Sequence, residues 1–137
     1  CNSFKQEILE AEHNFTASSG DTFNLALYDS DATLNKSTTA YTTSEELATT
    51  GGYTAKGKAL TSVTPVLDSD TAVCDFANTS WTSASFTARG CLIFNDDHAS
   101  DASVCAIDFG GDKTVTSGTF TVEFPAAAAS TAIIQIA

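Results

Sequence analysis

Basic residues are scarce in this chain. It has only 6 Lys and Arg against 17 Asp and Glu, which gives a formal net charge of −11 over 137 residues. Proteins hold nucleic acid phosphates with clustered Lys and Arg, so this charge balance excludes nucleic acid as a partner and disfavours an anionic membrane surface. The chain also lacks an apolar run long enough to span a bilayer as a helix. We therefore expect neither nucleic acid nor membrane among its partners.

Patterns that carry catalysis or bind cofactors are missing as well. There is no GxSxG, and neither Gly51-Gly52 nor Gly110-Gly111 matches a phosphate-binding loop. The acidic residues fall mostly in turn-like stretches that we interpret as solvated turns and not as calcium loops. These stretches are Asp29-Ser30-Asp31, Asp68-Ser69-Asp70 and the segment from Asp96 to Asp101 around His98. We predict no catalytic residue, no cofactor and no metal.

The cysteines do not form a metal site either. The four of them contain no CxxC, and neither His lies at a zinc-like spacing from a cysteine. Three of them, Cys74, Cys91 and Cys105, sit in apolar strand-like runs. We interpret them as buried reduced thiols, and the sequence leaves open a disulfide between two of those strands.

The residues that are present favour a single β domain. Hydrophobic residues make up 42% of the chain, and the polar remainder is dominated by Thr and Ser, which suit the solvent face of a strand. Alternating runs separated by Gly and Asp turns are typical of a β-sandwich or small jelly roll. We expect one antiparallel sandwich over 1–137, with an irregular surface segment from Asp29 to Lys56. The expected strands are Thr22–Tyr28, Lys58–Val63, Thr71–Phe76, Ser85–Phe94, Ser103–Phe109, Thr119–Phe124 and Ile133–Ile136. Turns are expected at Thr50-Gly51-Gly52, Asn95-Asp96-Asp97 and Gly110-Gly111-Asp112.

One helix is expected, from Ser3 to about Asn14, and it includes His13. Ser3 and Gln6 have the spacing of a capping box, in which each side chain satisfies a free backbone N–H. Apolar residues then recur at helical intervals, and this stripe must dock on its own domain or on a neighbouring chain. We therefore predict that 1–15 is a helical docking segment and that Phe4, Ile8 and Leu9 are interaction residues.

Aromatic and charged residues supply the remaining candidates. Tyr41, Tyr53 and Trp81 are candidate contact residues because exposed aromatic rings stack on sugars and anchor interfaces, although core packing is the favoured interpretation for Trp81. Asp108 ends an apolar run, and a buried carboxylate needs a partner. Arg89, the only Arg, is the expected partner, so both residues are assigned a structural role.

Several stretches together resemble small virion structural proteins of tailed bacteriophages. They are SFKQEILEAEHNF, DTFNLALYDSDATL, STTAYTT, GGYTAKGKALTSVTP, WTSASFTARGCLIFN, CAIDFGGDKTVTSGTFTVEFP and AIIQIA, and they cover nearly the whole chain in order. The resemblance implies a β-rich virion protein with an N-terminal helical segment and no catalytic motif. It also implies a location on the phage particle after synthesis in the host cytoplasm.

Two functions follow from these expectations. The first is a capsid decoration (cement) protein that binds the major capsid protein on the outside of a phage head, where an acidic surface lies away from packaged DNA. Such proteins are symmetric oligomers, and a homotrimer matches a local three-fold position. The second is a tail, baseplate or fibre component that uses exposed aromatic residues to bind host glycans. An enzyme such as a glycosidase would need two carboxylates facing each other across a groove, and the sequence does not predict such a pair.

Overall fold

The computed structural model describes all residues from 1 to 137 and contains one short helix and seven strands. Every strand pair is antiparallel, and the strands form a four-stranded sheet of order β2-β1-β5-β6 and a three-stranded sheet of order β3-β4-β7. The prediction of a mainly β, two-sheet fold with an N-terminal helix is confirmed. In chain order the elements are α1 (Asn2–Leu9), β1 (Phe23–Tyr28), β2 (Lys58–Ala59), β3 (Ser62–Asp68), β4 (Thr71–Phe76), β5 (Thr79–Asn95), β6 (Ser103–Val122) and β7 (Ile134–Ile136).

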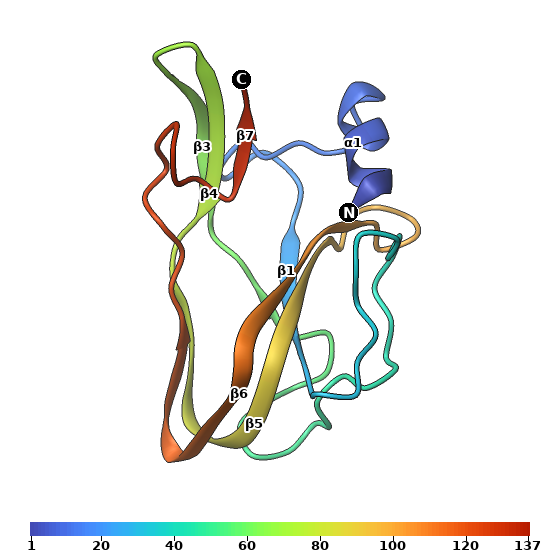
Figure 1. The fold of residues 1–137 in the computed structure, drawn as a ribbon, viewed down its shortest axis with the longest axis vertical. Coiled ribbons are helices and arrows are strands. Elements are labelled where there is room, and N and C mark those ends of the chain that lie inside the picture. The colour runs from blue at the N-terminus through green and yellow to red at the C-terminus, as the bar shows by residue number, and fades with distance from the viewer.

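The long paired strands β5 and β6 connect the two layers. Figure 1 shows that they bend together at their lower end, so that one arm runs beside β1 and the other runs up toward β3, β4 and β7. The pairing shifts register on both sides of Ala84, where Trp81 pairs with Phe120, Ala84 with Gly118 and Phe86 with Val115. Unequal residue numbers on the two strands bend a ribbon. One strand pair therefore contributes to both layers of the sandwich.

The predicted strands agree with the structure except near two glycines, at β2 and at the start of β5, which begins at Thr79 and not at Ser85. The run Thr71–Phe76 is β4 as expected, and the runs at Thr22, Ser85 and Ile133 lie within or beside β1, β5 and β7. The expected strand Lys58–Val63 is divided between β2 and the start of β3. The expected strands Ser103–Phe109 and Thr119–Phe124 belong to one strand, β6, which ends at Val122, so the predicted turn at Gly110-Gly111-Asp112 was wrong.

The helix is shorter than predicted. It ends at Leu9, and Ala11 has a left-handed φ of 61°, so His13 lies beyond the helix and not within it. The capping box was also wrong, because the N-cap is Cys1, the Ser3 hydroxyl has no hydrogen-bond partner, and the Gln6 amide donates to Glu10. The left-handed backbone at Ala11 ends the helical path, so the helical stripe does not continue to Phe15.

The main core lies between the two layers. Phe15 stacks on Phe23 with ring centroids 4.2 Å apart, and Phe76 packs against both rings. All six residues of β1 are buried, although only Phe23, Leu25 and Leu27 face this core. The other face of β1 is covered by the irregular segment Asp29–Lys56, whose Leu34 and Tyr41 pack over a second cluster that contains Tyr28 and Phe94.

All four cysteines are free thiols. Cys74 and Cys91 are buried, which confirms the prediction for those two, whereas Cys105 is half-buried on β6.

Candidate functional site

The outer edge of β6 is open. The sheet order β2-β1-β5-β6 places β6 at the margin of its sheet, and β5 is the only strand that pairs with it. Contacts on the outer side are confined to its start, where the Ser103 N–H bonds Thr39 and the N-terminal amine of Cys1 donates to the Val104 carbonyl. An unpaired strand edge is a template for pairing with another chain.

Gly110 and Gly111 form a bulge in this edge. Gly90 pairs with Asp108 and Ala88 with Lys113, so the β6 residues 109–112 lie opposite Arg89 alone. Gly110 adopts a left-handed φ of 74°, which is why a glycine is needed there. Bulges of this kind re-aim side chains at the margin of a sheet. The predicted turn is therefore a bulge within one strand, where regular pairing is interrupted but the chain does not reverse.

Arg89 bridges the two ends of the bulge. Its Nε lies 3.0 Å from Asp108 Oδ1, and its Nη1 lies 3.8 Å from Asp112 Oδ1. The predicted partnership of Arg89 and Asp108 is confirmed, but their side chains are 41% and 66% exposed, so the expectation of a buried pair was wrong. The hydrogen bond from Arg89, with a second from the Gly110 N–H, holds the pKa of the Asp108 carboxyl below its usual value. The contacts of Arg89 with Asp108 and Asp112 therefore hold the exposed bulge of β6 against β5.

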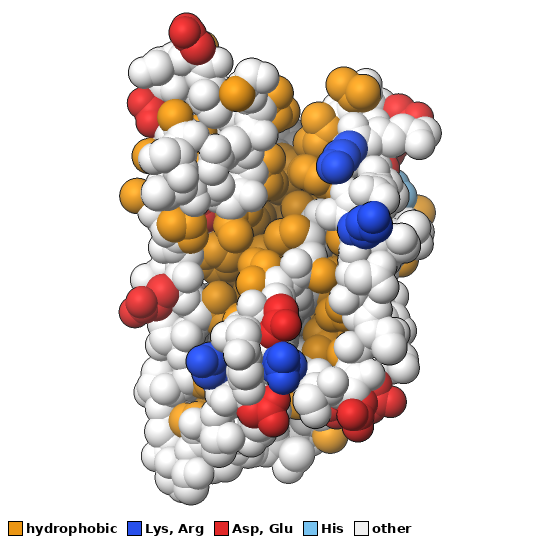
Figure 2. Space-filling model, in the orientation of Figure 1, with side chains coloured by type: hydrophobic (Ala, Val, Ile, Leu, Met, Phe, Trp, Pro, Cys, Tyr) orange, Lys and Arg blue, Asp and Glu red, His pale blue; other side chains and the backbone are white.

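An apolar groove lies beside β6 between its two arms. It encloses about 760 Å³, and Figure 2 shows hydrophobic side chains lining a hollow between the layers. Polar side chains, including those of Asp112, Lys113, Thr119 and Glu123, stand around it. We call this surface the β6 groove, and its apolar residues, half-buried against the main core, are Ile107, Phe109, Val115, Phe120, Phe124 and Ile133.

A second cavity of about 420 Å³ lies on the opposite face of β6. Four consecutive β6 residues, Cys105 to Asp108, line it together with Tyr28 and Leu34 of the second cluster, and Ile107 also lines the β6 groove. The second cavity is more polar, because Lys36 and Arg89 also line it. The open edge of β6 thus has a side-chain cavity on each of its faces.

The predicted aromatic contact residues are not exposed platforms. Tyr53 and Trp81 are only 2% and 5% exposed and pack in the main core, so a surface stacking role was wrong for both and core packing is confirmed for Trp81. Tyr41 is half-buried and stacks on Phe94 at 4.7 Å. The hydroxyl groups of Tyr41 and Tyr53 both donate to Glu46, which the sequence did not single out.

The N-terminal segment docks on its own domain. Phe4 and Ile8 pack against the main core, whereas Leu9 is 87% exposed. Behind them the buried His13 ring lies 3.0 Å from Glu7 and 3.1 Å from Asn95, which ties the helix to the end of β5. Of the three predicted interaction residues in this segment, only Leu9 offers its side chain to another molecule.

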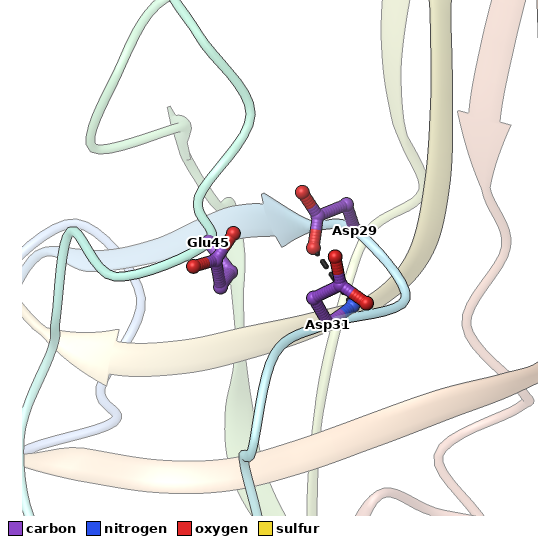
Figure 3. A group of neighbouring side chains, drawn as sticks. All are labelled: Asp29, Asp31 and Glu45. Atoms are coloured by element: carbon purple, nitrogen blue, oxygen red, sulfur yellow. Dashed lines mark hydrogen bonds between the residues drawn. The ribbon is translucent and has the colours of Figure 1, made fainter.

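Three carboxylates gather at the end of β1. Figure 3 shows Asp29, Asp31 and Glu45 turned toward one another, and their oxygens lie within 4.8 Å. The sequence interpretation grouped only Asp29 and Asp31, as a turn, and the Asp31 N–H does bond Asp29 at 2.9 Å. Glu45 joins them because the Asp29 N–H bonds its carbonyl at 3.1 Å. Nothing in the local sequence signals this long-range contact.

Aliphatic side chains are exposed on the second sheet. They lie on β3, which is the margin of the order β3-β4-β7, and their exposed fractions are 39% for Val63, 51% for Val66 and 75% for Leu67. The hairpin of β3 and β4 projects from one end of the molecule (Figure 1). This strand and the β6 groove each combine apolar side chains with an unpaired strand edge, and β7, the other margin of the second sheet, carries Ile136 at 56% exposure.

No family model, curated protein or solved structure matches this chain. No helix of the structure has the length and apolar character needed to cross a membrane.

Proposed function

We propose that this chain is a virion structural protein, a decoration protein that binds the outside of a tailed-phage head and stabilises it. The observation that carries the proposal is the open edge of β6 with an apolar groove beside it. A surface of this kind binds an extended segment of another protein through backbone hydrogen bonds and side-chain cavities. The β6 edge and its groove therefore suit a protein that assembles with other proteins.

The charge and the sequence stretches support the same proposal. A net charge of −11 suits an exterior position away from packaged DNA and keeps a protein soluble when many copies crowd together. The resemblance to phage virion proteins runs through β6, which lines the groove and forms its open edge. A protein that binds only the assembled shell stabilises that shell by mass action.

The tail-attachment alternative loses its main support. It depended on exposed aromatic rings for stacking on glycans, and the rings of Tyr53 and Trp81 lie in the core. A tail position does not require those rings. Localisation in the particle therefore has to distinguish a tail position from a head position.

Localisation in purified particles by cryo-EM tests the proposal. We expect many copies on the icosahedral lattice of the head, with the β6 side of each copy against a neighbouring protein. A few copies confined to the tail, or none in the particle, would overturn the decoration role.

A binding experiment tests which surface is used. Heads that lack the protein are titrated with the purified chain, with Val115→Lys, which places a charge in the β6 groove, and with Thr82→Lys as a control of equal charge change at an exposed position of β5. We expect at least tenfold weaker binding for Val115→Lys and unchanged binding for Thr82→Lys. Equal binding by all three proteins would remove the groove from the interface.

A further inference from the structure

The part of the chain that follows β6 crosses to the second sheet and reaches the β6 groove. β6 ends at Val122, and the Phe124 N–H bonds the Asn78 side chain at 2.8 Å, which fixes the chain up to this point. Residues 126–137, which we call the strap, then run to β7 at the margin of the order β3-β4-β7 (Figure 1). Ile133 of the strap is the one groove-lining residue outside the stretch from 107 to 125. The strap therefore supplies the one part of the groove that does not come from β6 and the residues directly after it.

Little apolar surface of the strap is buried. Ala132 is its only buried residue, and Ile133 and Ile134 are half-buried against the main core. β7 has three residues and pairs with β4 alone. Other hydrogen bonds join residues 126–132 to one another, so they stay formed when the strap moves as a unit. Local opening at a free energy below that of global unfolding is typical of segments with few buried apolar contacts.

A buried carboxylate on β4 makes the closed position of the strap costly. Asp75 is 1% exposed and forms no ion pair. Its Oδ1 accepts a hydrogen bond of 2.8 Å from the Phe76 N–H, and its Oδ2 accepts one of 3.3 Å from the Ile133 N–H of the strap. A carboxylate that is buried without a cation loses its hydration with little compensation. Opening removes the bond from Ile133 but lets water reach Asp75, so the regained hydration offsets part of the contacts that are lost.

We propose that the strap opens as a unit while the rest of the domain stays folded, and that this opening frees the edge of β4 and widens the β6 groove for a partner segment. The opening follows from the contacts of the strap alone, whereas its use in binding rests on the proposed function of the β6 groove. A partner that binds only the open form has an apparent affinity reduced in proportion to the open fraction. The strap thereby regulates the groove.

Hydrogen exchange followed by NMR tests the opening. We expect the Ile133 amide, and the amides of β4 and β7 that bond each other, to exchange at least tenfold faster than the amides shared by β1 and β5. Asp68 Oδ2 accepts a hydrogen bond of 2.7 Å from the Ala129 N–H of the strap, so Asp68→Ala should speed exchange in the strap at least threefold without changing β1 and β5. Asp70→Ala is the matched control, because it removes a carboxylate from the same turn that has no bond to the strap. Equal protection of the strap and of β1 would overturn the inference.

A reversible crosslink tests whether binding needs the open strap. Cys74 and Ile134 are direct partners in the pairing of β4 with β7, and the Cα atoms of such partners lie about 4.5–5.5 Å apart, within the range of a disulfide. Ile134→Cys, oxidised with glutathione disulfide, therefore locks the strap on β4, and dithiothreitol releases it. We expect the oxidised protein to lose the fast exchange of the strap and to bind heads at least tenfold more weakly than the same protein after reduction.

The outcomes separate this inference from the proposed function. Oxidised and reduced forms that bind heads equally would overturn the regulation of the groove by the strap and leave the decoration role intact. If the crosslink does not form, Asp68→Ala replaces it, and the larger open fraction should make it bind heads at least twofold more tightly than Asp70→Ala; equal binding would again overturn the regulation. A wild-type chain that binds no heads, although its strap opens in the exchange experiment, would overturn the decoration role and the use of the opening in head binding.

Discussion

Replacement of Tyr53 by Phe should destabilise this protein far more than the loss of one surface hydroxyl would. The Tyr53 side chain is 2% exposed, and its hydroxyl donates to Glu46 at 2.7 Å. The same oxygen accepts a hydrogen bond of 3.0 Å from the backbone N–H of Leu27. β2 covers β1 only at Asn24 and Leu25, so the tyrosine hydroxyl takes the place of a strand partner for Leu27.

The magnitude follows from these two bonds. A hydrogen bond to a charged group contributes about 1.5–3 kcal/mol, and a buried donor left without a partner costs about 1–3 kcal/mol. Glu46 keeps its bonds from Tyr41 and from the Lys56 N–H, which reduces the first contribution. We expect Tyr53→Phe to lower the free energy of unfolding by about 3 kcal/mol, which corresponds to a urea midpoint lower by roughly 1–2 M.

Urea unfolding followed by circular dichroism measures this change, with Tyr41→Phe as the matched control. Tyr41 also donates to Glu46, but it is half-buried, and the nearby backbone N–H of Lys56 keeps its hydrogen bond to Glu46 without the tyrosine, so the loss of the Tyr41 hydroxyl should cost less than half as much. A loss below about 0.5 kcal/mol for Tyr53→Phe would refute the reasoning, because changes of that size are typical of surface positions. Equal losses for both variants would show that the bond to Leu27 contributes nothing.

Three further predictions concern the helix, a thiol and the exposed ion pair. Ile8→Ala should lower the free energy of unfolding by about 1–2 kcal/mol because Ile8 packs on the core, whereas Leu9→Ala, at 87% exposure, should change it by less than about 0.5 kcal/mol in the same urea experiment. Burial raises the pKa of the Cys91 thiol, so iodoacetamide at pH 8 should not modify Cys91 until urea unfolds the chain. Mass spectrometry detects the modification, and rapid labelling of the native protein would contradict the burial of Cys91. Arg89 holds the pKa of the Asp108 carboxyl in the folded protein below the value of about 3.9 that Asp has in an unfolded chain. The stability that this ion pair contributes is therefore present above about pH 3.9, and it is lost as the pH falls through the lower pKa of the folded state. An NMR titration should show the Asp108 pKa rise in Arg89→Gln, and an unchanged titration would mean that the ion pair does not form in solution.

The sequence by itself determined the fold class and most strand positions. Side chains alternate across a strand with a period of two, so the apolar positions of Phe23, Leu25 and Leu27 already indicate a strand and its inward face. β4 was predicted at its observed bounds from a short run that follows the turn Asp68-Ser69-Asp70. The pairing of Arg89 with Asp108 was also predictable, because the chain has a single Arg and the two residues lie on adjoining strands.

The tertiary structure alone decided what these elements expose. Glycine permits a left-handed backbone in a turn and in a bulge alike, so Gly110 and Gly111 could not reveal that β6 continues through them; the register against β5 decided it. Burial of Tyr53 depends on contacts with β1 and Glu46 that no local pattern records. The β6 groove exists because one strand bends and contributes its side chains to both layers, and a surface made in this way depends on the path of the whole chain.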